Sequence, residues 1–101
     1  MAQKQIIWSK LAEEELAFVL EFYWIRNGNP EYSLKLLHQV AELIALLPKN
    51  NFLGKISDNG FTRVIVKKEF LIFYEVYANT IVIVSFYDSR QDPSKRIDKK
   101  N

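Results

Sequence analysis

The sequence predicts an α+β domain in the order β-αα-βββ, with a helical hairpin packed on one face of a small antiparallel sheet. Apolar residues recur at helical spacing in the first half of the chain, and the period changes to two after residue 61. The links between the last three apolar runs are so short that they permit only antiparallel hairpins. A chain of 101 residues builds one core. We therefore expect a single domain over residues 1–95 and a basic, frayed tail at 96–101.

A short strand should precede the first helix. The strand is QIIW at 5–8, and Ser9 is suited to cap the helix that follows. Glutamates at 13–15 place negative charge near the positive end of the helix dipole. The segment LAEEELAFVLEFYWIRN has helical spacing and stops at Asn27-Gly28. Its wide apolar face consists of two rows: Leu11, Phe18, Phe22 and Ile25 in one, and Ala12, Leu16, Val19, Leu20 and Tyr23 in the other.

The second helix is expected to run from Pro30 to Leu47. Asn29 is its predicted N-cap, Pro30 suits the first helical position, and Pro48 ends the helix. Because the link NGN between the two helices is short, they should form an antiparallel hairpin. One face of the second helix collects Leu36, Leu37, Val40, Leu43, Ile44 and Leu47.

Three strands are expected after a polar, turn-rich loop at 48–61. Each is rich in β-branched and aromatic residues, and the two links between them suit tight turns, Lys68-Glu69 less well than Ala78-Asn79. The predicted strands are TRVIVK at 62–67, FLIFYEVY at 70–77 and TIVIVSFY at 80–87.

Both faces of this sheet are mostly apolar, although a tight helical hairpin can cover only one of them. Covering a patch of roughly 500 Å² is worth on the order of 12 kcal/mol before ordering costs. We therefore expect the uncovered face to be a groove that binds a partner polypeptide. The alternative is that the first strand, the 48–61 loop and the C-terminal tail fold over it. The predicted groove consists of Val64, Val66, Leu71, Phe73, Val82, Val84 and Phe86.

Composition excludes several classes of site. The chain has no cysteine and a single histidine, so we expect no metal site and no cofactor. No apolar run approaches ~18 residues, and we expect a cytoplasmic protein without a membrane segment. Residues 1–89 sum to −1 and residues 90–101 to +3, so the surplus positive charge lies where the last strand ends.

The stretch TRVIVKKEFLIFYEVYANTIVIVSFYDSRQDPSK is the most specific part of the sequence. It has an arginine before a strand, a strand containing Tyr74, a short turn, an Ile/Val strand and a closing Arg-x-x-Pro. With the first strand and the helical hairpin, this order resembles the RelE/ParE superfamily, the toxins of bacterial type II toxin–antitoxin pairs, over residues 4–95. It is most similar to the ParE-type branch. The resemblance implies a cognate antitoxin whose C-terminal segment wraps the toxin and covers its sheet.

The resemblance also implies a cellular target. RelE-like members cut mRNA on the ribosome with cations of the second and third strands, whereas ParE-like members poison DNA gyrase. Aligned on Tyr74, the cationic positions fall on Thr62, Val64 and Leu71, and none of the three is basic. Cleavage needs positive groups to stabilise the phosphate, and Asp88 on the last strand would repel one. The predicted function is therefore that of a ParE-like gyrase inhibitor; if the protein is instead an enzyme, it would be an mRNA endoribonuclease.

Five residues are candidate contacts with the target, while no catalytic residue is assigned: Arg63, Tyr87, Asp88, Arg90 and Lys95. Asp88 and Arg90 are expected to continue the groove face as a polar rim, and Arg90 matches an arginine of the family. Two alternatives remain open. One is an mRNA endonuclease with shifted cations at Arg63, Lys67, Lys68 and Arg90. The other is a non-toxic module that only binds an antitoxin or itself.

Overall fold

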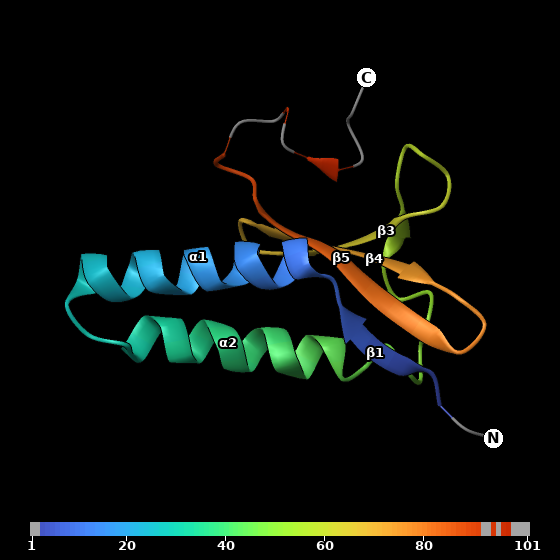
Figure 1. The fold of residues 1–101 in the computed structure, drawn as a ribbon, viewed down its shortest axis with the longest axis horizontal. Helices are drawn as coiled ribbons and strands as arrows, with labels where there is room; N and C mark the ends of the chain where they lie inside the picture. The colour runs from blue at the N-terminus through green and yellow to red at the C-terminus, as the bar shows by residue number, and fades with distance from the viewer. Residues whose placement is uncertain (1–2, 92–93, 95, 98–101) are drawn as a thin grey trace.

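The computed structural model describes residues 3–91, 94, 96 and 97. A helical hairpin covers one face of a sheet, and the hairpin end near Asn27 projects beyond that sheet (Figure 1). The predicted α+β order is confirmed. Neither helix in the described part of the chain is long and apolar enough to cross a membrane. The elements are β1 (Gln5–Trp8), α1 (Lys10–Asn27), α2 (Glu31–Ile44), β2 (Lys55–Ile56), β3 (Arg63–Lys67), β4 (Phe70–Val76) and β5 (Thr80–Asp88).

The sheet has five strands in the order β1-β5-β4-β3-β2. The last three form the predicted antiparallel meander. β1 instead runs parallel to β5, so the sheet is mixed and the prediction of a purely antiparallel sheet is wrong. β2 lies inside the segment predicted as loop, because two residues are too few to show a period.

α1 has the predicted boundaries but buries only one of its two apolar rows. The Ser9 side chain accepts a hydrogen bond from the backbone N–H of Ala12 at 3.0 Å, and Gly28 ends the helix in the left-handed region with φ 73°. The row that reaches the core consists of Ala12, Leu16, Val19 and Tyr23. The other row stays at the surface.

α2 is shorter than predicted. It begins at Glu31, whose backbone N–H donates to the Asn29 side chain at 3.0 Å, so Asn29 still satisfies one free amide of the first turn. The helix ends at Ile44, and turns follow up to Lys49. Leu47 lies in these turns and is fully buried. The apolar spacing therefore identified Leu47 as a buried position although the backbone there is no longer helical. Of the other residues on the predicted face, Leu36, Val40 and Ile44 are buried and Leu43 is partly buried, but Leu37 is 41% exposed, so its placement on the buried face is wrong.

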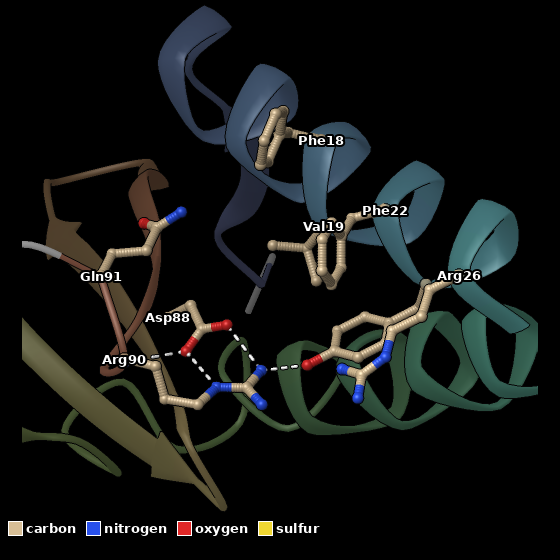
Figure 2. A pocket seen from close by; sticks show the side chains of 8 residues that line it. Phe18, Val19, Phe22, Arg26, Asp88, Arg90 and Gln91 are labelled. Atoms are coloured by element: carbon tan, nitrogen blue, oxygen red, sulfur yellow. Dashed lines mark hydrogen bonds and ion pairs between the residues drawn. The ribbon is translucent and has the colours of Figure 1, made fainter.

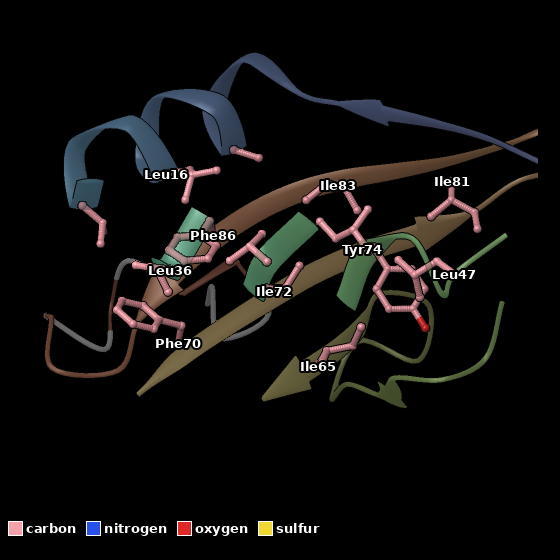
Figure 3. Close-up of a cluster of buried hydrophobic side chains, with 14 of the residues drawn as sticks. Leu16, Leu36, Leu47, Ile65, Phe70, Ile72, Tyr74, Ile81, Ile83 and Phe86 are labelled. Carbon is pink, nitrogen blue, oxygen red and sulfur yellow. The ribbon is translucent and has the colours of Figure 1, made fainter. Parts of the chain in front are cut away.

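The core lies between the hairpin and the sheet (Figure 3). Aliphatic side chains of α1, α2 and the turns after α2 pack on the inward residues of the three long strands. We call this side of the sheet the helix-side face and the opposite side the far face. The helix-side residues of the strands are Ile65, Phe70, Ile72, Tyr74, Ile81, Ile83 and Phe86.

Candidate functional site

An extra residue in β5 decides which side chains face the helices. Tyr74 pairs with Ile83, and the residue before Tyr74 pairs with Ser85, so Val84 has no partner on β4. Such a bulge reverses the alternation of every residue after it. Phe86 therefore lies in the helix-side core, and its assignment to the predicted groove is wrong.

The same reversal moves the polar end of β5. Asp88 pairs with Phe70, a helix-side residue, and Arg90 contacts α1. The prediction that Asp88 and Arg90 continue the groove face as its rim is therefore wrong. Tyr87 takes the far face instead, where it joins Leu71.

Arg90 ties the end of β5 to α1 (Figure 2). Its Nε donates to Oδ1 of Asp88 at 2.9 Å and its Nη2 donates to Oδ2 at 2.7 Å. Nη2 also donates to the hydroxyl of Tyr23 on α1. Glu69, in the turn between β3 and β4, lies 3.7 Å from the same nitrogen. One guanidinium therefore joins three parts of the fold.

This network keeps Asp88 ionised. Burial acts to raise the pKa of Asp88, but hydrogen bonds from the side chain and the backbone N–H of Arg90 outweigh it and hold the pKa below its usual value. The hydrogen bond to Asp88 in turn raises the pKa of Arg90. Burial and the nearby Glu69 raise the pKa of Tyr32, whose ring packs against Tyr23. Because Asp88 and Arg90 neutralise each other, the pair is poorly suited to general acid–base chemistry.

A cleft of about 270 Å³ opens between α1 and the end of β5 (Figure 2). It is slightly smaller than the about 300–1,000 Å³ usual for small-molecule sites. It suits one large side chain of another protein better than a cofactor. The residues around it include Phe18, Phe22, Tyr23, Arg26, Asp88 and Arg90.

The centre of the far face is covered by the chain's own C-terminal segment. Leu71, Phe73 and Tyr87 form a second buried cluster, against which Ile97 packs. The Arg96 guanidinium lies 5.7 Å from the centre of the Phe73 ring. The expectation of a face fully open to a partner is therefore wrong at its centre. Of the segments named in the alternative, the C-terminal tail does cover the centre of the far face, through Arg96 and Ile97.

The margin of the far face is more open. Val66 is 65% exposed. The other predicted groove residues on this margin are partly buried: Val64, Val82 and Val84. The remaining candidate contact, Lys95, lies outside the described residues, as do residues 98–101 of the predicted tail.

Arg63 and Tyr74 hold the loop before β2. The Arg63 guanidinium donates to the carbonyl of Gly54 at 2.8 Å and lies over the ring of Phe52 at 4.6 Å. The Tyr74 hydroxyl donates to the carbonyl of Asn51 at 2.9 Å and accepts the Gly54 N–H at 2.8 Å. Burial raises the pKa of Tyr74. A Cβ on Gly54 would meet the Tyr74 ring at 2.8 Å, so the loop passes too close for any other residue.

Sequence reasoning missed the residues that hold the end of β5. The spacing of α1 places Tyr23 in an apolar row, but nothing near it in the sequence indicates a hydrogen bond to an arginine 67 positions away. The position of Glu15 near the start of α1 indicates only a charge that favours the helix dipole. In the structure its Oε1 accepts from the Ser85 hydroxyl at 2.7 Å and from the Phe86 N–H at 3.1 Å. It thereby satisfies backbone that β1 no longer reaches. A glutamate on the sheet side of α1 was the only available signal.

Comparison with known proteins agrees with this architecture. The family model of the ParE toxin of type II toxin–antitoxin system, parDE, matches residues 6–93. The fold is similar to a chain in the solved structure of the chromosomal ParDE TA system from P. aeruginosa, with a TM-score of 0.74 and 21% identity; the match covers 85% of this chain and 96% of that chain. At 21% identity this similarity shows a shared fold and nothing further. No curated protein matches the sequence.

The family match begins at the second residue of β1 and runs beyond the end of β5, so it reaches every element described above. The resemblance to the ParE branch is thereby confirmed. The chain belongs to the ParE toxin family of type II toxin–antitoxin systems.

Proposed function

We propose that this toxin acts in the cytoplasm, inhibits DNA gyrase, and is neutralised by a cognate antitoxin. Family membership supports the role of a toxin. Two of its arginines already bond to other groups of the protein, and this favours a toxin that inhibits its target by binding it over one that cleaves RNA. Arg63 is committed to the Gly54 carbonyl and Arg90 to Asp88. A nuclease would need such cations to stabilise a phosphate during cleavage.

The positions that carry cations in the ribonuclease branch also disfavour cleavage. Thr62 is buried, and its hydroxyl donates to Glu75 at 2.9 Å. Leu71 is buried under the C-terminal segment, and Val64 packs against the same cluster. An apolar, covered surface here cannot stabilise the charge of a phosphoryl transition state.

For the antitoxin we propose a segment that lies along the margin of the far face. Val66 offers exposed apolar surface there. Lys55 on β2 pairs with Val64 on β3, and paired residues lie on the same face of a sheet. A positive charge therefore lies beside Val64 and Val66. An extended segment with apolar and acidic residues would complement this margin. To reach the centre, it would have to displace Arg96 and Ile97.

Four measurements test the proposed function. Purified protein should block supercoiling by gyrase in vitro, and its induction alone should arrest growth. Co-expression of an antitoxin from a neighbouring reading frame should restore growth. Primer extension on translated mRNA should show no cuts in the ribosomal A site. Unimpaired gyrase would contradict the proposal. Harmless overexpression would instead favour the non-toxic module, and A-site cuts the endonuclease.

The candidate target contacts can be tested by removing the charge of one lysine at a time. Lys95→Gln should weaken inhibition of gyrase if the basic C-terminal segment contacts the target. Lys35→Gln on α2 removes the same charge from the hairpin and should leave inhibition unchanged. Equal inhibition by both variants would remove Lys95 from the proposed contact surface.

A further inference from the structure

The second apolar row of α1 faces outward. Its members are spaced by seven, four and three residues, so they lie on one face of the helix. Two phenylalanines stand next to each other in this row. The exposed fractions are 49% for Leu11, 63% for Phe18, 49% for Phe22 and 72% for Ile25. Soluble monomers rarely leave a continuous patch of this kind uncovered unless it binds something. We call these four residues the outer row.

Charge is distributed unevenly along the outer row. Glu14 and Glu21 are seven residues apart and follow one edge of it. Lys10 lies 4.0 Å from Glu14, but both side chains are largely in solvent, so this pair contributes little. Residues 10–44, which contain the whole hairpin, carry three Lys/Arg against six Asp/Glu, a net charge of −3. Since the chain as a whole is +2, the rest of it is +5. The hairpin is thus the acidic part of a protein whose net charge is positive.

The cleft beside α1 adjoins the other edge of the outer row. Phe18 and Phe22 form one of its walls, and Arg26 lies at the same site (Figure 2). Binding energy at protein interfaces concentrates where a bulky side chain of one partner fills a pocket of the other. An amphipathic helix of another protein could lay its apolar face on the outer row and insert one side chain into the adjacent cleft.

We propose that the outer row binds an amphipathic helix of a partner protein. This helix carries basic residues along the edge that faces Glu14 and Glu21, and it places one bulky apolar side chain in the cleft. The inference rests on the exposed residues of α1 and not on the gyrase proposal. The surface is also distinct from the far face, where basic residues favour an acidic segment.

A second copy of this chain fits the outer row less well. If two α1 helices packed antiparallel about a two-fold axis, the acidic edge of one would meet the acidic edge of the other. Like charges in such positions repel each other. A basic partner helix replaces this repulsion with attraction.

Two synthetic helices test the proposal on the full chain. Both are about 20 residues long, to match α1, and share one leucine stripe with a single tryptophan for the cleft. One has lysines along its edge and the other has glutamates. Fluorescence anisotropy of the labelled peptides should show that the lysine peptide binds at least about tenfold more tightly than the glutamate peptide.

Variants locate the binding. Phe18→Ser with Ile25→Ser should weaken binding of the lysine peptide about tenfold. Val66→Ser on the far face is the matched control and should leave it unchanged. Glu14→Lys with Glu21→Lys should reverse the preference towards the glutamate peptide. These substitutions are at exposed positions, and far-UV circular dichroism confirms that each variant is folded.

Three outcomes would overturn the proposal. One is equal binding of the two peptides. Another is binding that Val66→Ser abolishes and the α1 variants do not. The third is a dimer in sedimentation velocity that Phe18→Ser with Ile25→Ser dissociates, because a second copy would then occupy the outer row.

Discussion

The two faces of the sheet are similar in composition but are buried by different means. On the helix-side face, α1, α2 and the turns up to Lys49 cover a continuous set of strand residues, and Ile72, Tyr74 and Ile83 are fully buried. On the far face a short C-terminal segment covers three residues, and the valines around them remain partly or largely exposed. Burial on the first face depends on two long helices, whereas burial on the second depends on side chains such as Ile97.

This contrast shows why composition alone cannot identify a binding surface. Both faces carry enough apolar area to require a cover. The chain supplies one cover that belongs to the folded core and another that a competing segment could replace at moderate cost. We therefore expect a partner to exchange with the toxin's own residues on the far face and not on the helix-side face.

The largest expected difference between the faces comes from removing a phenylalanine from each. Phe86→Ala leaves a cavity in the helix-side core, where its ring stacks on Phe70, and should cost about 4 kcal/mol. Phe73→Ala should cost less, about 3 kcal/mol, because the C-terminal segment can settle into the space. Urea unfolding measures both. Equal losses would mean that the far face is as rigidly packed as the helix-side face.

A second pair of variants compares a tyrosine hydroxyl on each face. Tyr74→Phe leaves the Gly54 N–H and the Asn51 carbonyl without their partner in a buried place, at a cost of about 2 kcal/mol. Tyr87→Phe removes a hydrogen bond to the Gln91 carbonyl within one turn, at about 1 kcal/mol. Urea unfolding gives both values. Faster amide exchange at Gly54 should accompany only the first variant, and its absence would contradict the role of Tyr74 as the anchor of the loop.

The third prediction tests which face Asp88 belongs to. Asp88→Asn should destabilise the fold by about 1–2 kcal/mol at neutral pH, a value limited by the half-exposed Arg90. The pKa of Asp88 in the folded state lies below its usual 3.8. Its contribution is therefore fully present above the usual pKa and is lost as the pH falls through the lower, folded value.

The difference in unfolding free energy between wild type and Asp88→Asn should accordingly stay constant from about pH 8 to about pH 5 and shrink below about pH 4. Glu21→Gln, also an acid-to-amide change, serves as the control because that side chain is exposed on α1. If Asp88→Asn behaved like Glu21→Gln at neutral pH, Asp88 would not be held by Arg90 on the helix-side face.

Most elements could be predicted from the sequence because their signals are local. Ser9 and Gly28 mark the ends of α1, and the change of period marks the meander. The β1–β5 pairing is parallel and links residues more than 70 positions apart, so nothing near QIIW reveals its direction. The fold class therefore followed from the sequence, while the mixed character of the sheet did not.

The candidate site could be predicted only in part, and the reason is one residue. Strict alternation predicts the correct face for the residues of β5 up to Ile83 and the wrong face from Phe86 onwards. The bulge at Val84 involves no glycine or proline, so the sequence carries no local signal of it. A single uncounted residue moved Phe86, Asp88 and Arg90 to the opposite side. The exposed row of α1 was visible as a second apolar row, but periodicity cannot show which of two rows a helix buries.

The smallest expected effect concerns the cover of the far face itself. Ile97→Ser removes an apolar side chain that packs on Leu71, Phe73 and Tyr87, and it should lower the free energy of unfolding by about 1 kcal/mol or less, because Ile97 is only partly buried. The main consequence should be local. A hydrophobic dye should bind more strongly to the variant. The NMR signals of the Leu71 methyl groups should shift, while those of Ile72 on the helix-side face stay in place.

The control is Val66→Ser, at an already exposed position of the far face, which should leave the dye signal unchanged or lower it. If Ile97→Ser bound no more dye than wild type, the C-terminal segment would not be the replaceable cover of this face. Any partner would then have to bind beside that segment and not in its place.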